Sequence, residues 1–181
     1  MSAPWLPWLA DVRRGDHDAF KSLHAHFGKL VHAIVIARVP AADAADLVQD
    51  VFLTVFQKLT QLEDDQAFPA WLSQLARSRV ARHLRDRKPT DELTDDAPVA
   101  APDRSSSPDA KKVLAAIHAL PEAYAETLAM RLIEGMTGPE IAERTGLTPG
   151  SVRVNLHRGM AQLREKLGLP ARPAEGGSDE D

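Results

Sequence analysis

Residues 140–159 read EIAERTGLTPGSVRVNLHRG, a pattern typical of two helices joined by a tight turn. Thr137 and Thr148 stand where a side-chain hydroxyl can cap a helix, and Pro149 follows at an early helical position where its missing N–H costs nothing. Gly146 suits the turn, which needs a left-handed backbone that glycine adopts at little cost. We therefore predict a helix-turn-helix in this stretch.

The two predicted helices have a buried and an exposed side. Ile141, the small Ala142 and Leu147 are expected inside, with Leu147 filling the core beneath the turn. Val152 and Leu156 fall on the buried face of the second helix. The exposed face of that helix is then formed by Ser151, Arg153, Val154, Asn155, His157 and Arg158.

The chemistry of this exposed face suits nucleic acid. Arginine reads guanine through two hydrogen bonds in the major groove, asparagine reads adenine, and serine, histidine and arginine bind phosphates. The plainer alternative is a helical hairpin with a solvated basic face. The coincidence of caps, a turn glycine, a small inward residue and a basic outer face favours DNA binding.

Composition narrows the class of protein. The 181 residues suit one or two small domains, and the absence of cysteine excludes disulfides, thiolate metal sites and thiol catalysis. No apolar run approaches the roughly 18 residues that span a membrane, and residues 1–14 lack a basic stretch before an apolar core. We therefore expect a cytoplasmic protein without membrane insertion. The net charge of −4 argues against a generic nucleic-acid binder, so the distribution of charge matters more than its sum.

The chain divides into two helical blocks. Apolar residues recur at three- and four-residue steps without a long alternating pattern, so the predicted fold class is all-α. Residues 89–109 are rich in proline, aspartate and serine, which predicts a flexible acidic linker. The linker joins two small helical domains, residues 1–88 and residues 110–168. Residues 169–181 predict a disordered acidic tail.

A second basic element lies in the helix predicted for residues 67–88. Its second half holds several cations against the single acid Asp86: Arg77, Arg79, Arg82, Arg85, Arg87 and Lys88. Such a helix provides an electrostatic footprint for a phosphate backbone. The residues alone leave open a solvated helix whose cations favour its C-terminal end. Trp71 lies on the apolar stripe of this helix and is expected in the core.

Three acids share one face of the helix that is predicted to start near residue 43. Asp43, Asp46 and Asp50 follow at i, i+3 and i+7, with Gln49 beside them. A metal site needs converging ligands and a catalytic pair needs a pocket, whereas an acidic face for a basic protein partner fits best. The alternative left open is that acids near a helix N-terminus favour the helix dipole. The histidines show no metal-binding spacing, so no metal or other cofactor is expected.

The order of elements carries a resemblance to a known family. The sequence presents DAADLVQDVF at 43–52, FPAWL at 68–72 opening an arginine-rich helix, an acidic linker, LPEAY at 120–124 and then the helix-turn-helix. In this order they resemble the extracytoplasmic-function sigma factors of bacterial RNA polymerase, over about residues 11–167. The resemblance implies a specificity subunit and not an enzyme, which binds core RNA polymerase and directs promoter-specific transcription initiation.

The resemblance also implies a role for each domain. Residues 1–88 correspond to sigma domain 2, which docks on the clamp helices of the largest polymerase subunit and opens the minus-ten element. Residues 110–168 correspond to sigma domain 4, which reads the minus-thirty-five element, and the polymerase flap is a further implied contact. The implied polymerase-binding residues are Asp43, Asp46, Gln49, Asp50 and Phe52. The implied minus-ten residues are Trp71, Ser78, Arg79, Arg82 and Arg85, and the implied minus-thirty-five residues are Ser151, Arg153, Val154, Asn155, His157 and Arg158.

The chain departs from the family pattern at two places. Ser78 stands where many members carry asparagine, and Val154 and Asn155 stand where many carry serine and arginine. Both departures are expected to change promoter preference and to leave the fold intact. The resemblance implies an anti-sigma factor as a further partner.

Two other classes of function remain as alternatives. A stand-alone helix-turn-helix repressor or activator usually needs a dimer interface that brings two recognition helices onto two half-sites, and no extra helix for this is evident. A small helical enzyme could use the aspartate cluster, but the sequence shows no nucleophile, phosphate loop or metal motif.

Overall fold

The computed structural model describes residues 3–87 and 107–170. These residues form helices and connecting turns without a strand, so the all-α prediction is confirmed. The first group of helices comprises α1 (Leu6–Arg13), α2 (His17–Ile36), α3 (Ala41–Lys58), the short 3-10 helices η1 (Leu59–Gln61) and η2 (Asp65–Ala67), and α4 (Phe68–Asp86). The second group comprises α5 (Pro108–His118), α6 (Glu122–Leu132), α7 (Gly138–Thr145) and α8 (Pro149–Lys166).

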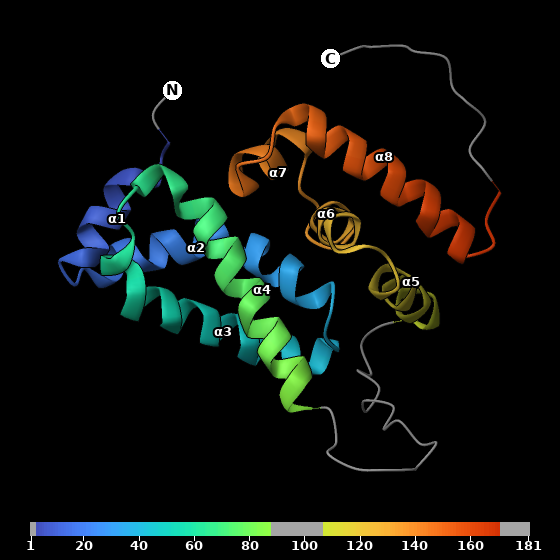
Figure 1. Ribbon diagram of the computed structural model, residues 1–181, viewed down its shortest axis with the longest axis horizontal. Helices are drawn as coiled ribbons and strands as arrows, with labels where there is room; N and C mark the ends of the chain where they lie inside the picture. The colour runs from blue at the N-terminus through green and yellow to red at the C-terminus, as the bar shows by residue number, and fades with distance from the viewer. Residues whose placement is uncertain (1–2, 88–106, 171–181) are drawn as a thin grey trace.

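Helix α2 is the centre of the first group. The Asp16 carboxylate caps its N-terminus by accepting the backbone N–H groups of Asp18, at 2.8 Å, and Ala19, at 3.1 Å. Helices α1, α3 and α4 all pack against α2, as Figure 1 shows. Phe27 of α2 and Phe68 of α4 meet with ring centroids 5.1 Å apart, and both side chains are fully buried. The group therefore has an ordinary aromatic and aliphatic core that fixes α3 and α4 relative to each other.

Helices α7 and α8 form the predicted helix-turn-helix. Thr137 and Glu140 make a capping box at the start of α7, and Gly146 ends α7 with the left-handed φ of +74°. Thr148 caps α8 by accepting the N–H of Ser151 at 3.1 Å. The caps and the turn glycine therefore act as the sequence predicts.

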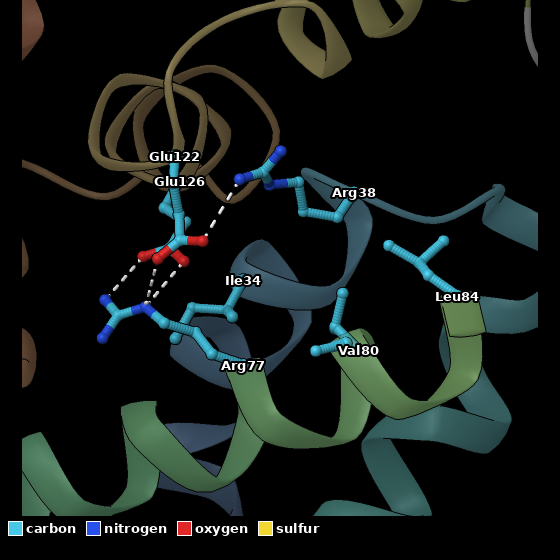
Figure 2. A pocket seen from close by; sticks show the side chains of 8 residues that line it. Ile34, Arg38, Arg77, Val80, Leu84, Glu122 and Glu126 are labelled. Atoms are coloured by element: carbon cyan, nitrogen blue, oxygen red, sulfur yellow. Dashed lines mark hydrogen bonds and ion pairs between the residues drawn. The ribbon is translucent and has the colours of Figure 1, made fainter. Parts of the chain in front are cut away.

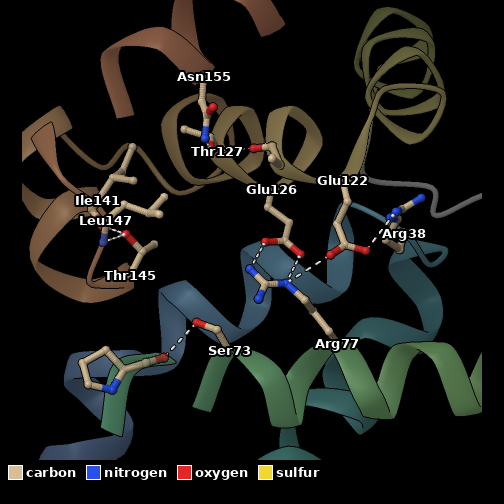
Figure 3. A network of polar contacts seen from close by, with 12 residues as sticks. Arg38, Ser73, Arg77, Glu122, Glu126, Thr127, Ile141, Thr145, Leu147 and Asn155 are labelled. Atoms are coloured by element: carbon tan, nitrogen blue, oxygen red, sulfur yellow. Dashed lines mark hydrogen bonds and ion pairs between the residues drawn. The ribbon is translucent and has the colours of Figure 1, made fainter. Parts of the chain in front are cut away.

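The expectation for Leu147 is wrong. Its side chain is 41% exposed, and its N–H donates to the Thr145 hydroxyl at 3.2 Å (Figure 3). The core near the turn is instead filled by Ile141 and Val152, which are almost fully buried. The left-handed residue before Leu147 turns the chain outward, so an apolar residue beside the turn lies at the surface.

Helix α8 crosses α6 closely at Gly159. A Cβ atom at this position would lie 3.2 Å from Leu128 Cγ and Cδ1 and 3.2 Å from Tyr124 Cβ. Real Cβ contacts are rarely so tight, so the missing side chain is what lets the two helices approach. The crossing sets the position of α8 on the second group.

The two groups of helices pack against each other. Helix α6 lies on α2, and α7 contacts both α2 and α4. Most of the predicted linker, residues 89–106, and most of the predicted tail, residues 171–181, lie outside the described residues, as does Lys88 of the predicted basic helix. The second group begins slightly before the predicted boundary at residue 110, because Ser107 caps α5 by accepting the N–H of Ala110 at 3.2 Å.

Candidate nucleic-acid interface

The outer face of α8 is a continuous exposed surface. Val152, Gly159 and Leu163 are the buried residues of this helix. The exposed side chains that were predicted as DNA contacts are Ser151, Arg153, Val154, His157 and Arg158. Their spacing places them on one side of α8, which can enter the major groove of DNA while the opposite side remains packed on α6.

Asn155 is placed differently from the prediction. It is half-buried, and its Nδ2 donates to the Thr127 hydroxyl of α6 at 3.4 Å (Figure 3). The same hydroxyl donates to the carbonyl of Ala123 at 2.6 Å. Asn155 therefore faces α6. Its hydrogen bond to Thr127, which is distant in the sequence, helps to hold α8 on α6.

Four of the predicted contacts on α4 share one stripe. Trp71, Ser78, Arg82 and Arg85 are at i, i+7, i+11 and i+14, which a helix places on one side. Ser78, Arg82 and Arg85 are exposed. Trp71 is half-buried and packs on Phe68 with ring centroids 5.9 Å apart. The stripe thus runs from the half-buried ring of Trp71, at the edge of the core, to the exposed cations Arg82 and Arg85 near the C-terminal end of α4.

Arg79 lies off this stripe. It is half-buried, and its Nη2 donates to the hydroxyl of Thr54 at 3.0 Å. The Thr54 hydroxyl in turn donates to the Asp50 carbonyl at 2.8 Å. Arg79 therefore ties α4 to α3, and its guanidinium is already engaged within the protein.

The exposed acidic face of α3 differs from the prediction at both ends: it begins at Asp46 and not at Asp43, and it extends beyond Asp50 to Leu53. Asp46, Gln49 and Asp50 are exposed, and within the described part of the chain neither carboxylate has an ion-pair partner. Leu53, which is 54% exposed, continues the same face at i+7 from Asp46 and i+3 from Asp50. Leu53 was not among the predicted residues, although this spacing was the signal that could have identified it. The face formed by Asp46, Gln49, Asp50 and Leu53 is called the α3 face below.

Two residues predicted for this face lie elsewhere. Asp43 is engaged with α4, where it pairs with His83 Nε2 at 3.3 Å and with the guanidinium of Arg87. Phe52 is only 2% exposed, and its ring lies 4.2 Å from that of His24. Asp43 therefore fastens the start of α3 to the end of α4, and Phe52 supports the α3 face from beneath.

His32 of α2 pairs with a carboxylate of the second group. Its Nδ1 contacts the Glu134 carboxylate, and the Lys29 ammonium donates to the Glu134 carbonyl at 3.2 Å. The hydrogen bond from Glu134 raises the pKa of His32 against the opposing effect of burial. The pair therefore links α2 to the turn that follows α6.

This link gives a pH-dependent contribution to stability. Because the pKa of His32 is raised in the folded protein, the contribution is complete below the ordinary value of about 6.5 and is lost as the pH rises through the raised value. For a partly exposed pair we expect at most about 1 kcal/mol. The difference in the free energy of unfolding between the wild type and His32→Gln should be larger at about pH 5.5 than at about pH 8.5.

A histidine titration by NMR tests whether Glu134 is what raises the pKa of His32. The pKa of His32 should exceed its ordinary value in the wild type and fall in Glu134→Gln. A His32 pKa at or below the ordinary value in the wild type would contradict the assignment.

Other kinds of site are not indicated by the described residues. Residues 3–87 and 107–170 contain no group of three or more histidine, aspartate or glutamate side chains arranged to hold a metal ion. None of the helices in these ranges is both long and apolar enough to cross a membrane.

Comparison with known proteins identifies both groups of helices. The family described as Sigma-70 region 2 matches residues 23–90, and the family described as Sigma-70, region 4 matches residues 110–163. The chain is 32% identical to RNA polymerase sigma factor CarQ of Myxococcus xanthus, over 86% of this chain and 93% of CarQ. It is 29% identical to ECF RNA polymerase sigma factor RpoE of Cereibacter sphaeroides, over 90% of this chain and 94% of that protein.

Solved structures agree with the fold. The structure of CnrH in complex with the cytosolic domain of CnrY aligns with a TM-score of 0.56 at 25% identity, over 90% of this chain and 96% of that one. The sigma factor RpoE of Bartonella quintana, solved with the anti-sigma factor NepR, aligns with a TM-score of 0.57 at 20% identity, over 86% of this chain and 100% of that one.

Proposed function

The chain belongs to the extracytoplasmic-function sigma factors, which direct RNA polymerase to promoters, and from this membership we propose which surface performs each step. As a sigma factor it binds core RNA polymerase and promoter DNA and directs promoter-specific initiation. Its surfaces have no catalytic role of their own, and it works in the cytoplasm beside the polymerase. Residues 1–88 act as sigma domain 2 and residues 110–168 as sigma domain 4.

The α3 face docks on the clamp helices of the largest polymerase subunit. The observation that carries this assignment is an exposed apolar side chain, Leu53, next to the carboxylates of Asp46 and Asp50, which have no ion-pair partner in the described residues. An apolar centre with unpaired charge beside it suits a protein partner of opposite charge. Asp43 and Phe52 contribute by positioning this face.

The stripe on α4 takes the opened minus-ten element. Ser78, Arg82 and Arg85 are exposed along one side of the helix, and Trp71 stands at its start. A cationic groove beside an aromatic ring is the usual combination for single-stranded DNA. Arg79 holds α4 on α3, and the small Ser78 side chain alters base selection at this element.

The outer face of α8 reads the minus-thirty-five element in duplex form. Arg153, Val154, His157 and Arg158 are exposed on it, with Ser151 near the helix N-terminus for a phosphate. Asn155 stabilises the position of α8 through Thr127 and is a weaker candidate for base contact.

Arg158→Ala should weaken recognition of the minus-thirty-five element by about 1–3 kcal/mol, because one exposed guanidinium that contacts a base is removed. The measurement is run-off transcription with core polymerase on promoters that differ in this element. Lys166→Ala, which removes another exposed cation from the C-terminal turn of α8, serves as the control and should leave initiation unchanged. Equal activity of both variants on every promoter would remove Arg158 from the interface.

Run-off transcription from genomic fragments tests the function as a whole. The protein alone should bind duplex promoter DNA weakly, whereas the mixture with core polymerase should initiate at defined sites. Tight binding to a palindrome as a dimer, with no initiation by core enzyme, would instead support a stand-alone repressor.

An anti-sigma factor is a further partner in this proposal, as family membership implies. The related protein CnrH was solved in complex with the cytosolic domain of CnrY. Purification from cells with and without the inducing condition, followed by identification of bound proteins, tests for such a partner.

A further inference from the structure

An apolar side chain stands among the polar residues on the outer face of α8. Val154 is 45% exposed, whereas Val152 on the same helix is almost fully buried. The two residues lie about 200° apart around the helix axis, because each residue of an α-helix advances by about 100°. A single exposed apolar residue is ordinary on a protein surface, so the surroundings of Val154 decide what it does.

The packing of α8 on α6 fixes the direction in which Val154 points. The next residue, Asn155, donates from Nδ2 to the Thr127 hydroxyl of α6 at 3.4 Å. Gly159 is buried at the crossing of the two helices, where a Cβ atom would lie 3.2 Å from the Leu128 side chain. Rotation of α8 about its axis would break the hydrogen bond and bring a neighbouring side chain into the crossing. Val154 is therefore held on the side of α8 that faces away from α6.

The contact of α6 with the first group uses a different side of that helix. The Arg77 guanidinium of α4 binds the buried Glu126 carboxylate, through Nε to Oε1 at 2.9 Å and Nη2 to Oε2 at 2.7 Å (Figure 2). Figure 3 shows Thr127 pointing toward α8 and Glu126 pointing toward α4. The orientation of α8 on α6 is thus set by contacts within the second group.

Val154 lies at the centre of the outer face. His157 and Arg158 follow it by one helical turn and are exposed on the same side. Gly150 precedes it by one turn, and a Cβ atom there would meet only the Thr148 hydroxyl, at 3.9 Å. The missing side chain at Gly150 leaves the backbone open, so this end of α8 can approach a ligand closely. Val154 therefore belongs to the first turns of the helix, the part of a recognition helix that contacts base edges.

The chemistry of valine suits one base. Valine neither donates nor accepts a hydrogen bond, and the amide of the adjacent Asn155 is turned to α6. A valine against the polar edge of guanine, adenine or cytosine would remove water from donors and acceptors and offer them no partner, which costs free energy. In the major groove thymine presents an apolar group, its C5 methyl. Val154 is thus matched to thymine.

We propose that Val154 is a specificity-determining residue that reads the C5 methyl group of one thymine in the minus-thirty-five element. The inference rests on the proposed function, in which the outer face of α8 enters the major groove of this element. Burial of one methyl-sized group changes a binding equilibrium by about three- to fivefold. Val154 therefore adds selectivity at one base pair, while the cations beside it contribute affinity for the DNA.

Replacement of thymine by deoxyuridine tests the contact, because it removes the methyl group and keeps the base pair. Each thymine of the minus-thirty-five element, on either strand, is replaced in turn. Initiation by core polymerase with the full-length protein is then measured at a limiting concentration of the protein. We expect one position at which deoxyuridine lowers initiation by about three- to fivefold.

The variant Val154→Ala identifies the side chain that reads the methyl group. Alanine is a good helix former at an exposed position, so α8 stays folded in this variant. The difference between thymine and deoxyuridine at the sensitive position should disappear in Val154→Ala. Leu169→Ala, which removes another exposed apolar side chain beyond the end of α8, is the control and should retain the whole difference.

The modified base 5-methylcytosine provides the reverse change. With a cytosine in place of the sensitive thymine, methylation of that cytosine should raise initiation by the wild type by about three- to fivefold. The same methylation should have no effect on initiation by Val154→Ala.

The outcomes separate this contact from the proposed function. If deoxyuridine lowers initiation at no position, the inference is overturned even though the protein directs transcription. An equal loss in the wild type and in Val154→Ala also overturns it, because another residue then reads the methyl group. If the protein directs initiation at no promoter, the proposed function fails, and the inference falls with it.

Discussion

Asp50→Arg is expected to abolish binding to core RNA polymerase and to leave the protein folded. Asp50 is exposed at the centre of the α3 face, and its side chain has no ion-pair partner among the described residues. Reversal of its charge places a cation against the basic surface of the partner, so both attraction and complementarity are lost. We expect the affinity to fall by at least about 100-fold, since unpaired or repelling charges in an interface cost several kcal/mol.

Fluorescence anisotropy with labelled protein and purified core enzyme measures this loss. Glu63→Arg is the matched control, because it makes the same charge change at an exposed position outside α3. Thermal melting of both variants should match the wild type. Wild-type affinity in Asp50→Arg would show that polymerase docks on another surface, and equal loss in both variants would show a general effect of net charge.

Gly159→Leu is expected to destabilise the second group of helices and to remove promoter recognition with it. The space for a Cβ atom is already only 3.2 Å from Leu128 and Tyr124, so a larger side chain must push α8 away from α6. Overpacking of this kind costs about 1–3 kcal/mol or more. Gly159→Ala should be milder, because the better helix propensity of alanine, about 1 kcal/mol, offsets part of the clash.

Gly150→Leu provides the comparison on the same helix. Gly150 is exposed, and a Cβ atom there would meet only the Thr148 hydroxyl at 3.9 Å. Urea unfolding followed by circular dichroism should show a large loss of stability for Gly159→Leu and little change for Gly150→Leu. If both variants unfold like the wild type, the crossing at Gly159 is not tight in solution.

The helix-turn-helix could be predicted because its signals are local. The hydroxyl caps at Thr137 and Thr148 and the left-handed Gly146 each act within a few residues of the chain. Which side chain fills the space beneath a turn depends on the neighbouring helices, and for this reason the expectation for Leu147 was wrong.

The site residues also divide into those fixed by local helical spacing and those whose position depends on contacts with other helices. Asp46, Gln49 and Asp50 lie on the surface as their helical spacing predicts. Asn155 was assigned to the outer face because Val152 and Leu156 were expected to form the buried one, but its partner Thr127 is distant in the sequence and lies on another helix.

The packing of the two groups could not be predicted from the sequence for a physical reason. Arg77 and Glu126 are 49 residues apart, and each reads as an ordinary solvated charge in its own helix. Only the folded chain brings the half-buried Arg77 guanidinium of α4 against the buried Glu126 carboxylate of α6 (Figure 3). Arg77 was therefore counted within the cation cluster on α4, for which the sequence left both a nucleic-acid footprint and a solvated helix open, and its partner on α6 was not predicted.

The burial of Glu126 also limits how this chain can be recombined. A chimera that joins residues 1–88 to the second half of another sigma factor keeps its own minus-ten surface and gains the donor's minus-thirty-five preference. Without an acid at the place of Glu126, the hybrid leaves Arg77 without its partner. Region exchange in promoter engineering thus needs matched halves, and a single acidic position is the first one to check.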